Sequence, residues 1–73
     1  MYLCWYDDNP KHSTPQKVAD ACAAYRARYG TSPNVALPSR DDYADGVDYG
    51  VTVRAEGYIR RNNVWVGWEN AAS

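Results

Sequence analysis

The stretch from Ser13 to Gly30, STPQKVADACAAYRARYG, decides the fold. Ser13 offers an N-cap, Pro15 lies in the first turn and Gln16 follows the cap by three residues, a pattern that begins a helix. Gly30 is a residue typical of a helix end. Between these signals, apolar side chains recur at the spacing of one helix face: Val18, Cys22, Tyr25 and Tyr29. The stretch predicts one amphipathic helix over residues 14–29, packed on a sheet.

Short apolar runs on either side of the helix predict strands. The N-terminal run MYLCWY, residues 1–6, is apolar on both faces and predicts a central strand. A short strand over Val35–Leu37, parallel to the first, is expected after the helix. Residues 42–45 are expected to form one helical turn. Val47–Arg54 alternates between apolar and polar residues, which predicts a half-buried strand.

The final predicted unit is a hairpin. Residues 58–61 and 64–69 flank Asn62-Asn63, and asparagine tolerates the positive φ of a tight turn. The register pairs Arg60 with Trp65. It assigns to the core Ile59, Val64, Val66 and Trp68, and to the opposite face Tyr58, Arg60, Trp65 and Glu69.

These elements define the expected architecture as α+β. One main helix packs on one face of a four- or five-stranded mixed sheet, in the order β-α-β, a short helical turn, then β-β-β. The length of 73 residues fits a single domain. That domain is expected to span residues 1–69, with residues 70–73 as a frayed tail.

Composition narrows the classes of function. The formal net charge is −1, which supplies no global basic field for nucleic acid. The sequence has neither a signal-peptide pattern nor an apolar run that could span a membrane, so the expected location is the cytoplasm. Seven Tyr and three Trp stand beside few aliphatic residues. A core this aromatic lies near the surface or is completed by a second subunit.

The favoured site is a partner surface on the hairpin, formed by Tyr58, Arg60 and Trp65, with Arg61 at the tip and Arg54 nearby. An aromatic side chain beside a guanidinium is typical of binding surfaces, although cross-strand Arg–Trp pairs also stabilise hairpins that bind nothing. The leading hypothesis is a non-catalytic protein-interaction module or oligomeric subunit, whose partner is another protein or a second copy in a homodimer. Weak binding of single-stranded nucleic acid is a further alternative, disfavoured by the net charge.

The alternative site is the acidic loop that contains Asp7, Asp8 and His12. Carboxylate and imidazole together could bind a divalent metal or act as acid and base, as a small metal-binding protein or enzyme requires. The simpler interpretation is that both aspartates are turn residues beside a helix N-terminus. An enzyme is less expected than a binding module, and no cofactor is predicted.

Other polar groups carry weaker signals. Asp41, Asp42, Asp45 and Asp48 do not match the spacing of an EF-hand loop and are best explained as turn residues. The helix N-terminus lacks the glycines of a phosphate-binding loop. Cys4 and Cys22 could be neighbours across the helix–sheet contact, but two buried free thiols are expected more than a disulfide.

Overall fold

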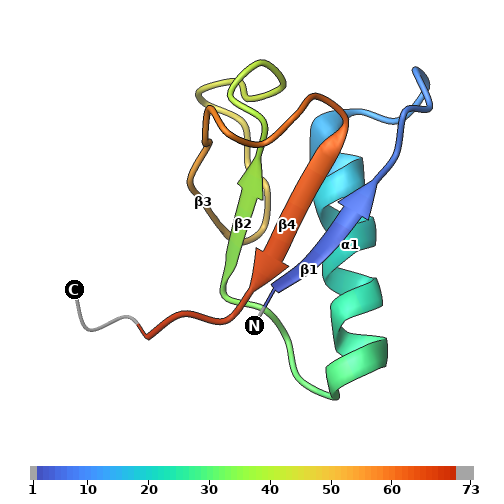
Figure 1. The fold of residues 1–73 in the computed structure, drawn as a ribbon, viewed down its shortest axis with the longest axis vertical. Helices are drawn as coiled ribbons and strands as arrows, with labels where there is room; N and C mark the ends of the chain where they lie inside the picture. The colour runs from blue at the N-terminus through green and yellow to red at the C-terminus, as the bar shows by residue number, and fades with distance from the viewer. Residues whose placement is uncertain (1, 71–73) are drawn as a thin grey trace.

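A computed structural model describes residues 2–70, and one helix packs there against a four-stranded mixed sheet, which confirms the expected α+β class (Figure 1). The helix is α1, Thr14–Tyr29. The strands are β1, Tyr2–Tyr6; β2, Val35–Pro38; β3, Thr52–Val53; and β4, Asn63–Gly67. Met1 and residues 71–73 of the predicted tail lie outside the described residues. Among the helices described, none has the length and apolarity to cross a membrane.

The helix follows its local signals. The Ser13 hydroxyl accepts a hydrogen bond from the backbone N–H of Gln16, and Gly30 ends the helix with a φ of 75°. A left-handed φ of this kind favours glycine, whose backbone N–H here donates to the Arg26 carbonyl. The predicted helix is confirmed at both ends. It forms because the caps and the alanine-rich sequence between them favour helix locally.

The strand order corrects the prediction for the N-terminal strand. The order is β1-β4-β2-β3, so β1 lies at an edge and the prediction of a central strand is wrong. The C-terminal strand β4 inserts between β1 and β2 and pairs antiparallel with both. β1 is apolar on both faces because α1 covers one of them and aromatic neighbours lie on the other, where Tyr2 and Trp65 are adjacent.

The predicted hairpin is also wrong. Both edges of β4 are occupied by β1 and β2, which leaves no edge on which residues 58–61 could pair. Those residues form turns, and the Cα partners of Trp65 are Cys4 and Leu37 instead of Arg60. Asn62 does adopt positive φ, at 67°.

The segment after β2 is less regular than predicted. Of the predicted strand over 47–54, only Thr52 and Val53 form a strand, β3, which pairs parallel with Val35 and Ala36 of β2. Tyr49, Val51 and Val53 nevertheless pack against the core, as the alternation predicts, whereas Val47 is exposed. Residues 42–45 contain turns in place of the expected helical turn.

The two faces of the sheet carry separate cores. The larger core lies between α1 and the sheet and contains Val18, Ala21, Tyr25, Ala36, Val64 and Val66. The smaller core lies on the opposite face and contains Val35, Leu37 and Ile59, flanked by Tyr2 and Trp65. Two core predictions are therefore corrected: Ile59 packs on the face opposite Val64, and Trp68 is half-exposed.

Candidate functional site

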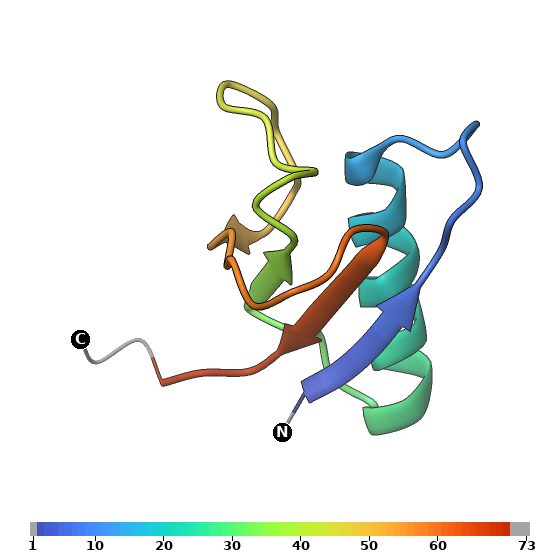
Figure 2. The same ribbon diagram turned by 45° about the horizontal axis from the view of Figure 1, so that its top comes forward.

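The β1–β4 half of the sheet is covered by α1 on one face only, and Figure 2 shows the helix on that single side. On the other face, Ile59 packs over the two β2 side chains of the smaller core. Near β1 the face is more exposed: the Tyr6 side chain is 62% accessible, and Cys4 is exposed. We call this surface the open face and define it by Cys4, Tyr6, Tyr58, Arg60, Asn63 and Trp65.

A shallow pocket of about 260 Å³ lies in the open face, lined by Tyr58, Ile59, Arg60, Asn63 and Trp65. The rings of Tyr58 and Trp65 meet edge to face, with centroids 6.1 Å apart and planes inclined by 72°. The structure thus brings together Tyr58, Arg60 and Trp65, three of the four residues of the predicted partner surface. It does so through a turn rather than through a hairpin register.

Local anchors hold this turn in place. The Ile59 side chain is 3% exposed and fixes the turn to the smaller core. The Ile59 backbone N–H donates to the Glu56 carbonyl at 3.3 Å, and the Asn63 N–H donates to the Arg60 carbonyl at 3.1 Å. The pocket is therefore built on a buried anchor at its base and on the beginning of β4 at its side.

The arginines near the pocket differ in their partners. Arg54 forms ion pairs with Glu56 and Glu69, and Arg61 lies 3.5 Å from Asp42. Among the described residues, no carboxylate forms an ion pair with the exposed Arg60. Of the two arginines of the predicted surface, Arg60 thus lines the pocket while Arg61 points to the 41–46 segment.

A separate charged network joins the sheet to the end of the described chain. Arg54 donates two hydrogen bonds of 3.0 Å to the Glu69 carboxylate, and the Tyr2 hydroxyl donates to the same carboxylate. The Arg54 bonds, followed by the Tyr2 bond, lower the pKa of Glu69 to about 2. The Glu69 bond raises the pKa of Tyr2 above its ordinary value. This network occupies Arg54 and removes it from the predicted partner surface.

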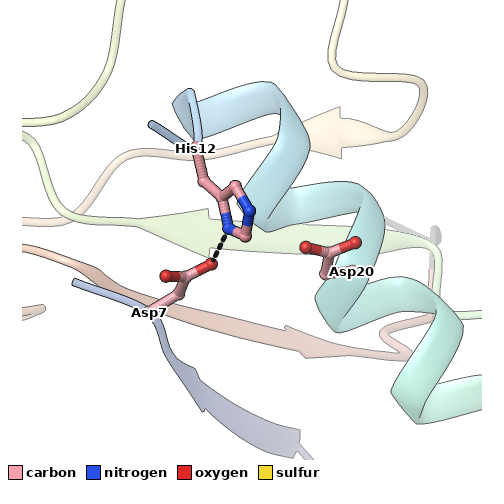
Figure 3. Close-up of side chains that lie close together, drawn as sticks. All are labelled: Asp7, His12 and Asp20. Atoms are coloured by element: carbon pink, nitrogen blue, oxygen red, sulfur yellow. Dashed lines mark hydrogen bonds and ion pairs between the residues drawn. The ribbon is translucent and has the colours of Figure 1, made fainter. Parts of the chain in front are cut away.

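The alternative site is only partly assembled as predicted. His12 Nδ1 donates to Asp7 Oδ2 at 2.6 Å, and Asp20 on α1 lies beside them (Figure 3). One ligand atom from each of these three residues falls within 4.8 Å of the others. The His12 bond, followed by the Asn9 backbone N–H, lowers the pKa of Asp7. Asp8 does not belong to this group; its charge instead raises the pKa of Tyr6.

The surroundings of Asp7 also have a structural explanation. Asp7 Oδ1 accepts the Asn9 backbone N–H at 2.9 Å, which is an Asx turn. The Asp7 N–H donates to the Asn62 carbonyl, and Asn62 Oδ1 accepts a 3.0 Å bond from buried Lys17. A lysine near the carboxylate weakens the site for a cation, because like charges repel.

The remaining candidates do not converge. Asp42 accepts the Asn62 N–H, Asp48 accepts the Gly50 N–H and Asp45 raises the pKa of Tyr43, so each of these acids has its own local contact. Cys4 and Cys22 are both free, and they lie on opposite faces of the sheet. Burial raises the pKa of Cys22, which lines a second pocket of about 310 Å³ with Arg26.

Sequence reasoning missed three features of these sites. Asn63 lines the pocket, and Tyr6 lies beside Asn63 because β1 pairs with β4, a long-range contact that no local pattern indicates. Asp20 joins His12 because α1 folds back against the 7–12 loop. Its position in the second turn of the helix, near the acidic loop in sequence, was the available signal.

No protein-family model matches the chain, and neither a curated protein nor a solved structure gives a significant match.

Proposed function

We propose that this protein is a non-catalytic interaction module whose open face binds a protein segment. The supporting observation is the pocket between Tyr58 and Trp65, with an arginine at its rim that forms no ion pair in the described chain. Exposed aromatic rings beside a guanidinium are enriched at protein interfaces and dominate their binding energy.

The chemistry of the pocket defines the segment that fits it. A volume of about 260 Å³ takes one apolar or aromatic side chain, which would pack against the two rings. The Arg60 guanidinium would then pair with a carboxylate nearby on the same segment. The preferred ligand is therefore an apolar residue with an acidic neighbour.

The pocket lining supports binding rather than a reaction. It consists of two aromatic rings, an isoleucine, an amide and a guanidinium. These groups give area, hydrogen bonds and charge. Single-stranded nucleic acid suits the pocket less well, because Arg54 and Arg61 already contact carboxylates and leave little cationic track for a phosphate backbone.

The test is a selection of random linear peptides on the immobilised protein, followed by affinity measurements on the selected peptides. We expect enriched peptides to carry an apolar residue beside Asp or Glu. Trp65→Ala and Arg60→Glu should each weaken them by about tenfold or more, which corresponds to about 1.4 kcal/mol.

Trp68→Ala is the control, because Trp68 is a half-exposed tryptophan outside the pocket lining, whereas Trp65 is partly buried and lines the pocket. It should leave peptide affinity unchanged. Selected peptides that bind Trp65→Ala and the unaltered protein equally would contradict the proposal.

A second candidate function, divalent-cation binding, is favoured by the convergence of Asp7, His12 and Asp20. Zinc held at about 2.0–2.2 Å by nitrogen and oxygen places its ligand atoms about 3.3 Å apart in a tetrahedron. The three ligand atoms lie within 4.8 Å of one another, and a cation bound through His12 Nδ1 would replace the 2.6 Å hydrogen bond between this nitrogen and Asp7. The third ligand of this candidate site is Asp20, instead of Asp8 as predicted from the sequence.

A further inference from the structure

Within residues 2–70, β1 is an edge strand, and its outer edge pairs with no other strand. The β1–β4 register continues to Asp7, whose N–H donates to the Asn62 carbonyl at 2.9 Å. Backbone groups alternate in direction along an antiparallel strand, so Leu3, Trp5 and Asp7 direct theirs toward β4. The N–H and C=O groups that point away from the sheet therefore belong to Tyr2, Cys4 and Tyr6.

Natural proteins usually protect such an edge with charges, proline, a bulge or a covering segment. β1 is five residues long, YLCWY, and contains neither a charge nor a proline. It pairs with β4 in an uninterrupted register, without a bulge. The nearest charges, Asp7 and Asp8, come directly after the strand.

We infer that β1 pairs antiparallel with β1 of a second copy of this chain, about a twofold axis at Cys4. The outward N–H and C=O groups of the two copies can hydrogen-bond only where an even-numbered residue of one copy lies opposite an even-numbered residue of the other. A twofold axis at Cys4 uses all three, with Cys4 opposite Cys4 and Tyr2 opposite Tyr6. An axis at Leu3 or at Trp5 would use only two of them.

Charge supports this antiparallel arrangement of two copies. Antiparallel pairing places the Asp7–Asp8 pair of each copy at opposite ends of the new strand pair, whereas parallel pairing would place the acids side by side. Side chains of Cys4 and Tyr6 are exposed in the single chain, so the cross-strand contacts with the second copy are unoccupied.

The pairing would join two four-stranded sheets into one sheet of eight strands. Both open faces would lie on the same side of the combined sheet, because a twofold axis perpendicular to a sheet preserves its faces. The inference goes beyond the peptide-binding function and does not require it, since the edge of β1 is distinct from the pocket.

Sedimentation equilibrium under reducing conditions, at about 0.1 mM protein, measures the association. We expect a dimer for the unaltered chain and for Cys4→Ser, and a monomer for Cys4→Lys. The lysine substitution would bring two like charges together on the axis, at a position that is exposed in the single chain. A monomeric unaltered chain, or a Cys4→Lys variant that remains dimeric, would overturn the inference.

Amide hydrogen exchange tests the same register without a substitution. Dilution to monomer should speed exchange at Tyr2, Cys4 and Tyr6, while Leu3 and Trp5 stay protected by β4. Equal protection of all five amides at every concentration would contradict the pairing.

Oxidation by diamide in a Cys22→Ser background gives a third readout. Cα atoms of a hydrogen-bonded pair lie about 5.5 Å apart, within disulfide reach, so a Cys4–Cys4 crosslink should form.

Failure of the pairing is distinguishable from failure of the peptide-binding function. Trp65→Ala should still dimerise, and the unaltered chain diluted to monomer should still bind selected peptides. A Trp65→Ala variant that became monomeric would place the interface on the open face instead of the β1 edge, and would overturn the inference.

Discussion

The ring of Tyr58 stands edge-on to the ring of Trp65, with centroids 6.1 Å apart, although the two residues belong to different elements. Trp65 lies on β4, and Tyr58 lies in the turn before it. Ile59, the residue after Tyr58, is buried and packs with Val35 and Leu37. This packing holds Tyr58 beside Trp65. The pocket is therefore a product of the smaller core.

Ile59→Ala should destabilise the fold and weaken the pocket together. Truncation of a buried isoleucine costs about 2–5 kcal/mol, because it removes apolar contact and leaves a cavity. Urea unfolding of Ile59→Ala beside Tyr58→Ala would check this prediction. Because Tyr58 is exposed, Tyr58→Ala should lower the free energy of unfolding by less than about 1 kcal/mol. Equal losses for both variants would show that Ile59 is not the anchor.

The contribution of Glu69 to stability should depend on pH. Its pKa of about 2 in the folded chain lies below the ordinary value of 4.5, so the folded state favours the ionised form. The stabilisation is then fully present above pH 4.5 and is lost as the pH falls from 4.5 to about 2. Thermal unfolding of the unaltered chain and Glu69→Gln should differ most near neutral pH and converge near pH 2. A difference independent of pH would contradict the Arg54–Glu69 assignment.

Asn62 precedes β4 and contacts both α1 and the segment after β2. Its substitution should separate the cost of backbone strain from the cost of a lost side-chain hydrogen bond. It has a φ of 67°, accepts from Lys17, and donates its backbone N–H to Asp42. Asn62→Ala should lose about 1–3 kcal/mol, from a strained backbone and a lost hydrogen bond. Asn62→Gly should recover the backbone part, because glycine adopts this φ freely. Chemical denaturation measures both, and equal stability of the two variants would argue against backbone strain.

Zinc should raise the melting temperature if Asp7, His12 and Asp20 form a cation site, because a ligand that binds the folded state stabilises it. Asp20→Asn should abolish the shift, and Asp8→Asn should preserve it, since Asp8 lies outside the group. Isothermal titration with zinc gives an independent readout. A zinc shift that survives Asp20→Asn, or no shift in the unaltered chain, would rule out this second candidate.

Local signals predicted the helix to the residue, whereas the strand pairings were not predictable from them. Ser13 caps the helix through Gln16, and Gly30 ends it through Arg26. Each of these contacts joins residues at most four positions apart, so the sequence alone predicts them. Pairing of β1 with β4 joins residues more than fifty positions apart, and an apolar run does not say which strand lies beside it. The same limit explains why Asp20 was missed. The hairpin register that predicts Tyr58, Arg60 and Trp65 as one surface is absent from the fold, yet the turn at 57–62 brings these three residues to one pocket.

The most direct test of the proposed function is an amide chemical-shift map of the protein during titration with a selected peptide. Binding at the pocket predicts the largest changes at Tyr58, Arg60, Asn63 and the Trp65 indole, with little change along α1. The Trp65→Ala variant should lose these changes, and Trp68→Ala should keep them. Changes centred on α1 or on the acidic loop would contradict the claim that the open face is the binding surface.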